Sequence, residues 1–147
     1  MSARPKVQGV PKPREAEVLA AVVACLRIYG VQVERQNTGA GTNPSGRLVR
    51  FGRKGNADLT GTLPGGRRIE VEVKAPGRRP RPEQIRRLIE HNAQGAVAFW
   101  TADARAVNQV IRRIHEGWRV EIDPETGDQW LVSPDDSWTP AGGERAP

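Results

Sequence analysis

Three residues near the middle of the chain carry side chains that could bind a divalent metal ion and act on a phosphate ester. Asp58 is followed by Glu72 on the next predicted strand, and Lys74 comes two residues after Glu72. Carboxylate oxygens are the ligands that Mg²⁺ prefers, and a bound Mg²⁺ polarises a phosphodiester and an attacking water. A nearby ammonium could orient that water or offset charge on the phosphate. The same residue types are common on solvated strands, so the pattern has chemical meaning only if the fold brings the three together.

The segment that contains Glu72 and Lys74 has the pattern of a β-strand. Residues 69–74 alternate strictly between apolar and charged side chains. Because side chains on a strand point alternately to its two faces, Glu70, Glu72 and Lys74 share one face. Glu70 could therefore support the site or be an exposed neighbour.

The preceding turn sets which residue faces Glu72. A three-residue loop at 64–66, with glycine in the left-handed conformation, pairs the strands so that Asp58 lies opposite Glu72. A two-residue loop would pair Asp58 with Val73 and turn its carboxylate to the apolar side. Opposed residues have Cβ atoms about 4.5–5.5 Å apart, so both carboxylates could reach one Mg²⁺ or Mn²⁺ ion. The charge of that ion would relieve their mutual repulsion.

Hydrophobic periodicity and turn residues predict the other elements and one domain. The expected elements are helices at 14–29, 82–95 and 104–115, strands at 31–35, from 57, at 69–74 and at 96–100, a strand remnant at 48–51, and a hairpin at 118–132. Residues 37–46 read as a mobile loop. The order is α-β-β-β-α-β-α with a terminal hairpin, an α/β fold. We expect a flexible basic arm at 1–13, a domain at 14–133 and a disordered tail at 134–147.

The spacing of these residues resembles the Asp…(Asp/Glu)-x-Lys signature of the PD-(D/E)xK nuclease superfamily. Within it, the chain is similar to the VRR-NUC family of stand-alone, Holliday-junction-resolvase-like nucleases. The likeness covers about residues 14–115 and includes Arg35-x-Asn37-Thr38-Gly39, Gly55-x-x-Asp58, Glu72-x-Lys74 and Gln84. The chain departs from the family pattern in having Val110-Ile111-Arg112-Arg113 in place of a literal Val-Arg-Arg triplet.

The resemblance implies a restriction-endonuclease-like αβββαβ core, with a mixed central sheet flanked by helices, and a role for each matching residue. Asp58 and Glu72 would be metal ligands, with the Val73 carbonyl as a further ligand and Lys74 as the catalytic lysine. Gln84 would be an active-site glutamine. Glu17 would be the acid of the first helix, although acids in a first helical turn also complement the helix dipole. Family members of this kind act as homodimers on branched DNA.

Charge is distributed unevenly along the chain and favours a polyanionic partner. Residues 1–90 hold 18 Lys and Arg against 8 acids, a net charge of +10, whereas residues 91–147 hold 5 against 9, a net charge of −4. Neutralising phosphates releases counterions, and this dominates non-specific affinity for nucleic acid. Basic residues that flank the candidate site, and that we expect to contact DNA, are Arg35, Arg47, Arg50, Arg53, Lys54, Arg78, Arg79 and Arg81.

The sequence therefore predicts a Mg²⁺- or Mn²⁺-dependent endonuclease that hydrolyses DNA phosphodiesters, with branched DNA as substrate. Two alternatives stay open: a non-catalytic nucleic-acid-binding module, and a restriction-like enzyme that cuts linear duplex. Cys25 is the single cysteine, so no disulfide can form within one chain, and with no membrane-spanning run we expect a soluble cytoplasmic protein. Tryptophans in the terminal hairpin could pack the core or the interface of a homodimer.

Overall fold

A computed structural model describes residues 11–36, 39–42, 44–51, 55 and 57–141. Four strands form the central sheet: β1 (Gln32–Arg35), β4 (Leu59–Thr62), β5 (Arg68–Val73) and β6 (Val97–Thr101). Their order is β1-β4-β5-β6: β4 pairs antiparallel with both β1 and β5, and β5 pairs parallel with β6. The protein is thus a mixed α/β fold, as predicted.

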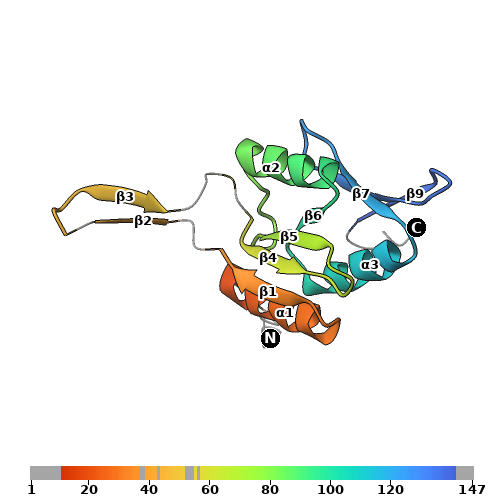
Figure 1. The fold of residues 1–147 in the computed structure, drawn as a ribbon, viewed down its shortest axis with the longest axis horizontal. Coiled ribbons are helices and arrows are strands. Elements are labelled where there is room, and N and C mark those ends of the chain that lie inside the picture. The colour runs from red at the N-terminus through yellow and green to blue at the C-terminus, as the bar shows by residue number, and fades with distance from the viewer. Residues whose placement is uncertain (1–10, 37–38, 43, 52–54, 56, 142–147) are drawn as a thin grey trace, which may run out of the picture.

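Helices cover both faces of this sheet (Figure 1). Helix α2 (Pro82–Ala93) packs against β5 and β6 on one face, and α1 (Glu15–Ile28) and α3 (Ala104–His115) pack together on the other. All residues of β5 after Arg68 are buried, so the strand is enclosed on both sides. The charged face of β5 that the sequence predicts is therefore covered by protein.

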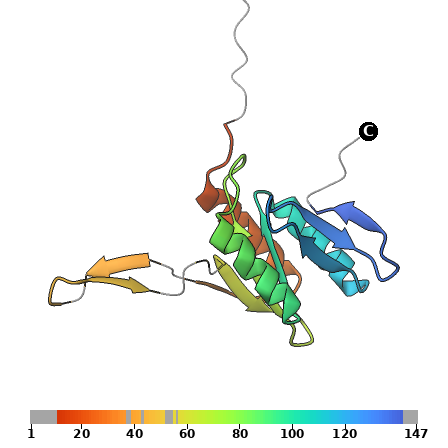
Figure 2. The ribbon, with the colours of Figure 1, turned by 90° about the horizontal axis from the view of Figure 1, so that it is seen from above.

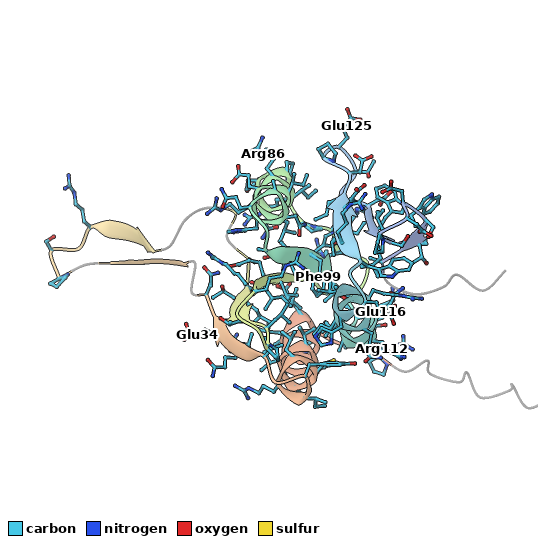
Figure 3. All side chains as sticks on the ribbon, turned by 45° about the vertical axis from the view of Figure 1, so that its right-hand side comes forward. Glu34, Arg86, Phe99, Arg112, Glu116 and Glu125 are labelled. Atoms are coloured by element: carbon cyan, nitrogen blue, oxygen red, sulfur yellow. The ribbon has the colours of Figure 1, made fainter. Side chains whose placement is uncertain are left out.

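The main hydrophobic core lies between the sheet and the helices α1 and α3. The apolar side chains of β5 share it with Phe99, which lies near the centre of the body in Figure 3. The helices contribute Val18, Val22, Leu26, Val107, Val110, Ile111 and Ile114. This helical spacing buries one stripe of each helix. The exposed side of α3 is mostly polar, whereas that of α1 includes several alanines and Ile28.

The β4–β5 hairpin has the predicted register. The Leu63 N–H donates to the Arg67 carbonyl at 2.8 Å across the loop, and Gly65 and Gly66 have φ angles of 100° and 96°. Left-handed backbone of this kind favours glycine. Pairing runs from Thr62↔Arg68 to Leu59↔Val71, so Asp58 comes next, opposite Glu72.

The strand remnant expected at 48–51 is confirmed as a strand, but residues 39–42, expected in a loop, also form one. Strand β2 (Gly39–Thr42) pairs antiparallel with β3 (Leu48–Phe51) in a sheet of their own, with register Gly39↔Phe51 to Thr42↔Leu48. Figures 1 and 2 show this pair projecting from the body. The sequence conceals β2 because its residues are Gly, Ala, Gly and Thr, which give no apolar alternation.

The chain ends in three strands where a hairpin was expected. Strand β7 (Arg119–Ile122) pairs with β8 (Gln129–Val132), and β8 pairs with β9 (Trp138–Pro140). The prediction that the chain is disordered from residue 134 is therefore wrong for residues 134–141. A turn closed by the Ser133 N–H, which donates to the Ser137 carbonyl at 2.8 Å, returns the chain to β8.

The remaining boundaries agree closely with the expected ones. Helix α3 has the predicted limits, and the other predicted helices and central strands differ by one or two residues at their ends. The predicted basic arm lies mostly outside the described residues. No helix in the described part of the chain is long and apolar enough to cross a membrane.

Candidate active site

Glu72 is the centre of a buried polar cluster on the α2 side of the sheet. It is 1% exposed. Its Oε2 accepts a hydrogen bond from the Asp58 backbone N–H at 3.1 Å, and its Oε1 accepts one from the Gln84 side-chain amide at 2.6 Å. The Lys74 ammonium lies 3.2 Å from the same Oε1. Strand β5, the residue before β4 and helix α2 thus each contribute a group to one carboxylate.

Asp58 in turn accepts a hydrogen bond from the strand that carries Glu72. It lies in a bend immediately before β4, is half-buried, and its Oδ2 accepts a hydrogen bond from the Val73 backbone N–H at 2.8 Å. Each acid therefore holds the backbone of the other's strand. The structure brings Asp58, Glu72 and Lys74 together at the end of the hairpin, as the alternation and the loop length predict.

Burial and charge raise the pKa of Glu72 to about 7. Loss of hydration is the largest cause, and the neighbouring Asp58 carboxylate raises the pKa further. Lys74 acts in the opposite direction, through its charge and its hydrogen bond, without cancelling the increase. Near neutral pH the positive charge beside the two acids is consequently too small to keep both of them fully ionised. Perturbed titration of this kind is frequent where a protein binds ions or performs chemistry.

Gln84 has a fixed orientation in the cluster. Its amide oxygen accepts a hydrogen bond from the Arg81 backbone N–H at 2.9 Å, at the start of α2, while its amide nitrogen donates to Glu72. A side chain held at both ends restricts the rotation of Glu72 in turn. The sequence predicts a place for Gln84 in the site, and the structure shows this contact.

Gly55 fits the segment before Asp58 closely against the same helix. It has a φ of +87°, and a Cβ at this position would lie 2.8 Å from the Glu83 carbonyl oxygen. A larger residue would therefore have to move either the backbone of α2 or the approach to Asp58. The glycine in Gly55-x-x-Asp58 sets the distance between the helix and the acid.

Glu70 is a second buried carboxylate on the same face of β5. It is 0% exposed and accepts hydrogen bonds from Thr60 Oγ1 at 2.7 Å, Arg68 Nε at 2.5 Å and Gln36 Nε2 at 3.1 Å. The sequence left open whether Glu70 is exposed or supports the site; the structure buries it. Alternation could have placed Thr60 on this face with Asp58, but nothing in the sequence marks Gln36.

Glu17 has the contacts of a helix cap. It is exposed in the first turn of α1, and its Oε2 accepts a hydrogen bond from the Arg14 backbone N–H at 3.3 Å. The structure does not bring its carboxylate into contact with Asp58, Glu72 or Lys74. Of the acids that the resemblance implies, Asp58 and Glu72 form the cluster and Glu17 lies apart from it.

The basic residues expected to contact DNA have different surroundings. Arg35, Arg47, Arg78 and Arg81 are exposed, Arg50 is in β3, and Arg53 and Lys54 lie outside the described residues. Arg79 is engaged within the protein: it donates to the Thr126 carbonyl at 2.5 Å, pairs with Asp128 at 2.6 Å and lies over the Trp100 ring, 5.3 Å from its centre. It joins the loop after β5 to the β7–β8 turn.

Among the described residues, no group of three or more His, Cys, Asp or Glu side chains is arranged to hold a metal ion. The cluster offers two carboxylates together with backbone oxygens. Comparisons with protein-family models, with curated proteins and with solved structures each give no match. What is established is therefore a mixed α/β protein with a buried Asp–Glu–Lys–Gln cluster at the end of a hairpin.

Proposed function

We propose that the protein is an endonuclease that hydrolyses DNA phosphodiester bonds with Mg²⁺ or Mn²⁺, and that branched DNA is its substrate class. The observation that carries the proposal is the reciprocal pairing of Asp58 with Glu72, with Lys74 in contact with Glu72. The element order α1, β1, β4, β5, α2, β6 supports the finer assignment to a restriction-endonuclease-like core.

The donor set suits a hard divalent cation. A carboxylate has about four lone-pair positions, and the described contacts of Glu72 occupy three of them, whereas those of Asp58 occupy one. Oxygen lone pairs are thus left over on both acids. Burial and the Asp58 carboxylate raise the pKa of Glu72, and a bound cation would stabilise its ionised form. Asp58, Glu72 and the Val73 carbonyl would hold the ion, with water completing its coordination.

In the proposed reaction, Lys74 and Gln84 have separate roles beside the metal ligands. A bound divalent ion would supply the charge that polarises the phosphodiester and acidifies water. Lys74, with a side chain 15% exposed, can reach both Glu72 and a molecule entering the site, so it orients the attacking water or offsets charge on the phosphate oxygens. Gln84 holds the Glu72 carboxylate in place.

Cleavage of defined DNA substrates tests the proposal. Labelled four-way junction, flap, splayed-arm and linear duplex DNA are each incubated with Mg²⁺, Mn²⁺ or EDTA. We expect metal-dependent cleavage with preference for a branched substrate. Sequence-specific cuts in linear duplex without branch preference would favour a restriction-like enzyme, and binding without cleavage would favour a non-catalytic module.

We further propose that the active protein is a homodimer. Trp138 on β9 is 65% exposed, and Trp130 lies beside it in the same three-stranded sheet, so an apolar surface is available for a second copy. Light scattering of the intact chain and of Trp138→Ala at micromolar concentration tests this proposal. A monomer in both samples contradicts it.

A further inference from the structure

The β2–β3 pair is the one part of the described chain that extends away from the helices and the central sheet (Figures 1 and 2). In the sheets that the structure describes, these two strands have only each other as partners. An isolated two-stranded hairpin is of marginal stability in water. A ribbon of this kind gains order when it lies against a partner.

The described residues that flank this arm, Gln36 before β2 and Gly55 after β3, both lie beside the candidate active site. On the incoming side the Gln36 N–H donates to the Asp58 carbonyl at 2.8 Å, and the Gln36 side chain donates to Glu70 at 3.1 Å. On the outgoing side Gly55 lies against the Glu83 carbonyl of α2. A partner bound by the arm is consequently attached to the part of the molecule that carries Asp58 and Glu72.

The charge of the arm indicates the chemistry of that partner. Between Glu34 and Asp58 the sequence has five basic residues and no acid. Of these, Arg47 is exposed just before β3, and Arg50 is in β3. Two copies of such an arm would repel each other, whereas a polyanion would attract it.

The shape of the arm matches one groove of duplex DNA. The major groove of B-DNA admits a two-stranded β-ribbon. Strands β2 and β3 form a ribbon of this kind, with four residues in each strand.

We propose that the β2–β3 arm lies in the major groove of the duplex that flanks the scissile phosphate, with Arg47 and Arg50 contacting its phosphates. This inference rests on the proposed function for the DNA substrate but not on the metal or the chemistry. The arm would bind one duplex of the substrate, while the cluster of Asp58 and Glu72 acts on the scissile phosphate.

Binding without cleavage tests the arm separately from the catalytic site. Fluorescence anisotropy with a labelled 30-base-pair duplex in EDTA compares the parent with Arg47→Ala/Arg50→Ala over a range of salt concentrations. The matched control is Arg27→Ala/Arg112→Ala, which removes two exposed arginines from helices α1 and α3, on the other face of the sheet. In Figure 3 Arg112 lies on the side of the body away from the arm.

We expect the arm variant to bind at least about tenfold more weakly, with a salt slope smaller by about 1 for each arginine lost. The control is expected to bind as the parent does. Equal weakening of both variants would show general attraction and overturn the proposal, as would an unchanged arm variant. Cleavage is not measured here, so loss of binding and absence of nuclease activity are separate results.

A second variant replaces residues 39–51 with a short Gly-Ser linker and leaves Gln36 and Gly55 in place. We expect it to keep the unfolding temperature of the body, to lose binding as the arginine variant does, and to shorten the hydroxyl-radical footprint on the duplex. If it becomes monomeric while the parent is dimeric, and binds duplex as before, the arm is a contact between copies and the proposal is wrong.

Discussion

Strand β5 buries two glutamates, Glu70 and Glu72, on the same face, but with opposite surroundings. Glu70 has a guanidinium, a hydroxyl and an amide directed at it. Glu72 has an amide and an ammonium, but also a second carboxylate within the same cluster. A buried carboxylate that is fully paired stabilises one geometry, whereas one that faces another acid keeps a demand for positive charge. Under the proposed function, Glu70 is a structural carboxylate and Glu72 is one that takes part in the chemistry.

The largest expected effect is on the cleavage rate, when Glu72 or one of its neighbours Asp58 and Lys74 is replaced. Glu72→Ala, Asp58→Ala and Lys74→Ala should each lower the rate of metal-dependent cleavage by on the order of 10³-fold or more, because each removes an interaction with the metal or the phosphate. Binding of DNA in EDTA should persist. Glu34→Gln, an exposed carboxylate on β1 (Figure 3), is the matched control. Cleavage at the parent rate by any of the three variants would refute the mechanism.

The metal-free protein should lose stability as pH rises through the range in which Glu72 titrates. The folded protein holds a proton on Glu72 up to a pKa of about 7, whereas the unfolded chain releases it near 4.5. The contribution of this group to the free energy of unfolding is therefore fully present below pH 4.5 and is lost by about pH 7. The loss amounts to about 3 kcal/mol. Urea unfolding of the parent and of Glu72→Gln between pH 4.5 and 8 measures the difference. Parallel pH profiles of the two proteins would contradict the expectation.

At Glu70, the expected effect is on the free energy of unfolding. Glu70→Ala should lower the free energy of unfolding by about 2 kcal/mol, because it removes the buried acceptor of the hydrogen bonds from Thr60 and Gln36. Cleavage per folded molecule should fall less than tenfold. Chemical denaturation and cleavage of one sample separate the two quantities. A loss of cleavage as large as that of Glu72→Ala, in a folded protein, would remove the distinction between the two glutamates.

Glu17 should show the smallest effect. Glu17→Ala removes one partner of the capping box at the start of α1, which is expected to lower the free energy of unfolding by about 1 kcal/mol. Because its contacts lie away from the cluster, the cleavage rate should change by only a few-fold. A loss comparable to that of Asp58→Ala would restore the role that the family resemblance implies.

Sequence patterns could predict the contacts that follow from local periodicity. Alternation on β5 and the glycines of a three-residue loop determine the register, and the register brings Asp58 to Glu72. The proline at the start of α2 and the helical stripe behind it are sufficient to place Gln84 at the first turn. These predictions needed no knowledge of packing between distant segments.

The features that were missed depend on long-range pairing. Strand β2 has no apolar side chain larger than alanine, so its pairing with β3 leaves no trace in hydrophobicity. Strand β9 was missed because a turn rich in Ser and Asp looks like the start of a disordered tail. Glu70 was ambiguous because one strand cannot show that α2 covers its charged face.

The reciprocal bonds at the end of β4 and β5 have a dynamic consequence. Beyond Leu59 and Val71 the carboxylates of Asp58 and Glu72, rather than backbone carbonyls, receive the N–H groups of the opposite segment. Two side chains thus continue the ladder of the sheet by one step. Exchange of the Val73 amide hydrogen with solvent then requires Asp58 to release it, so its protection factor follows the ionic state of the pair rather than the opening of the whole sheet.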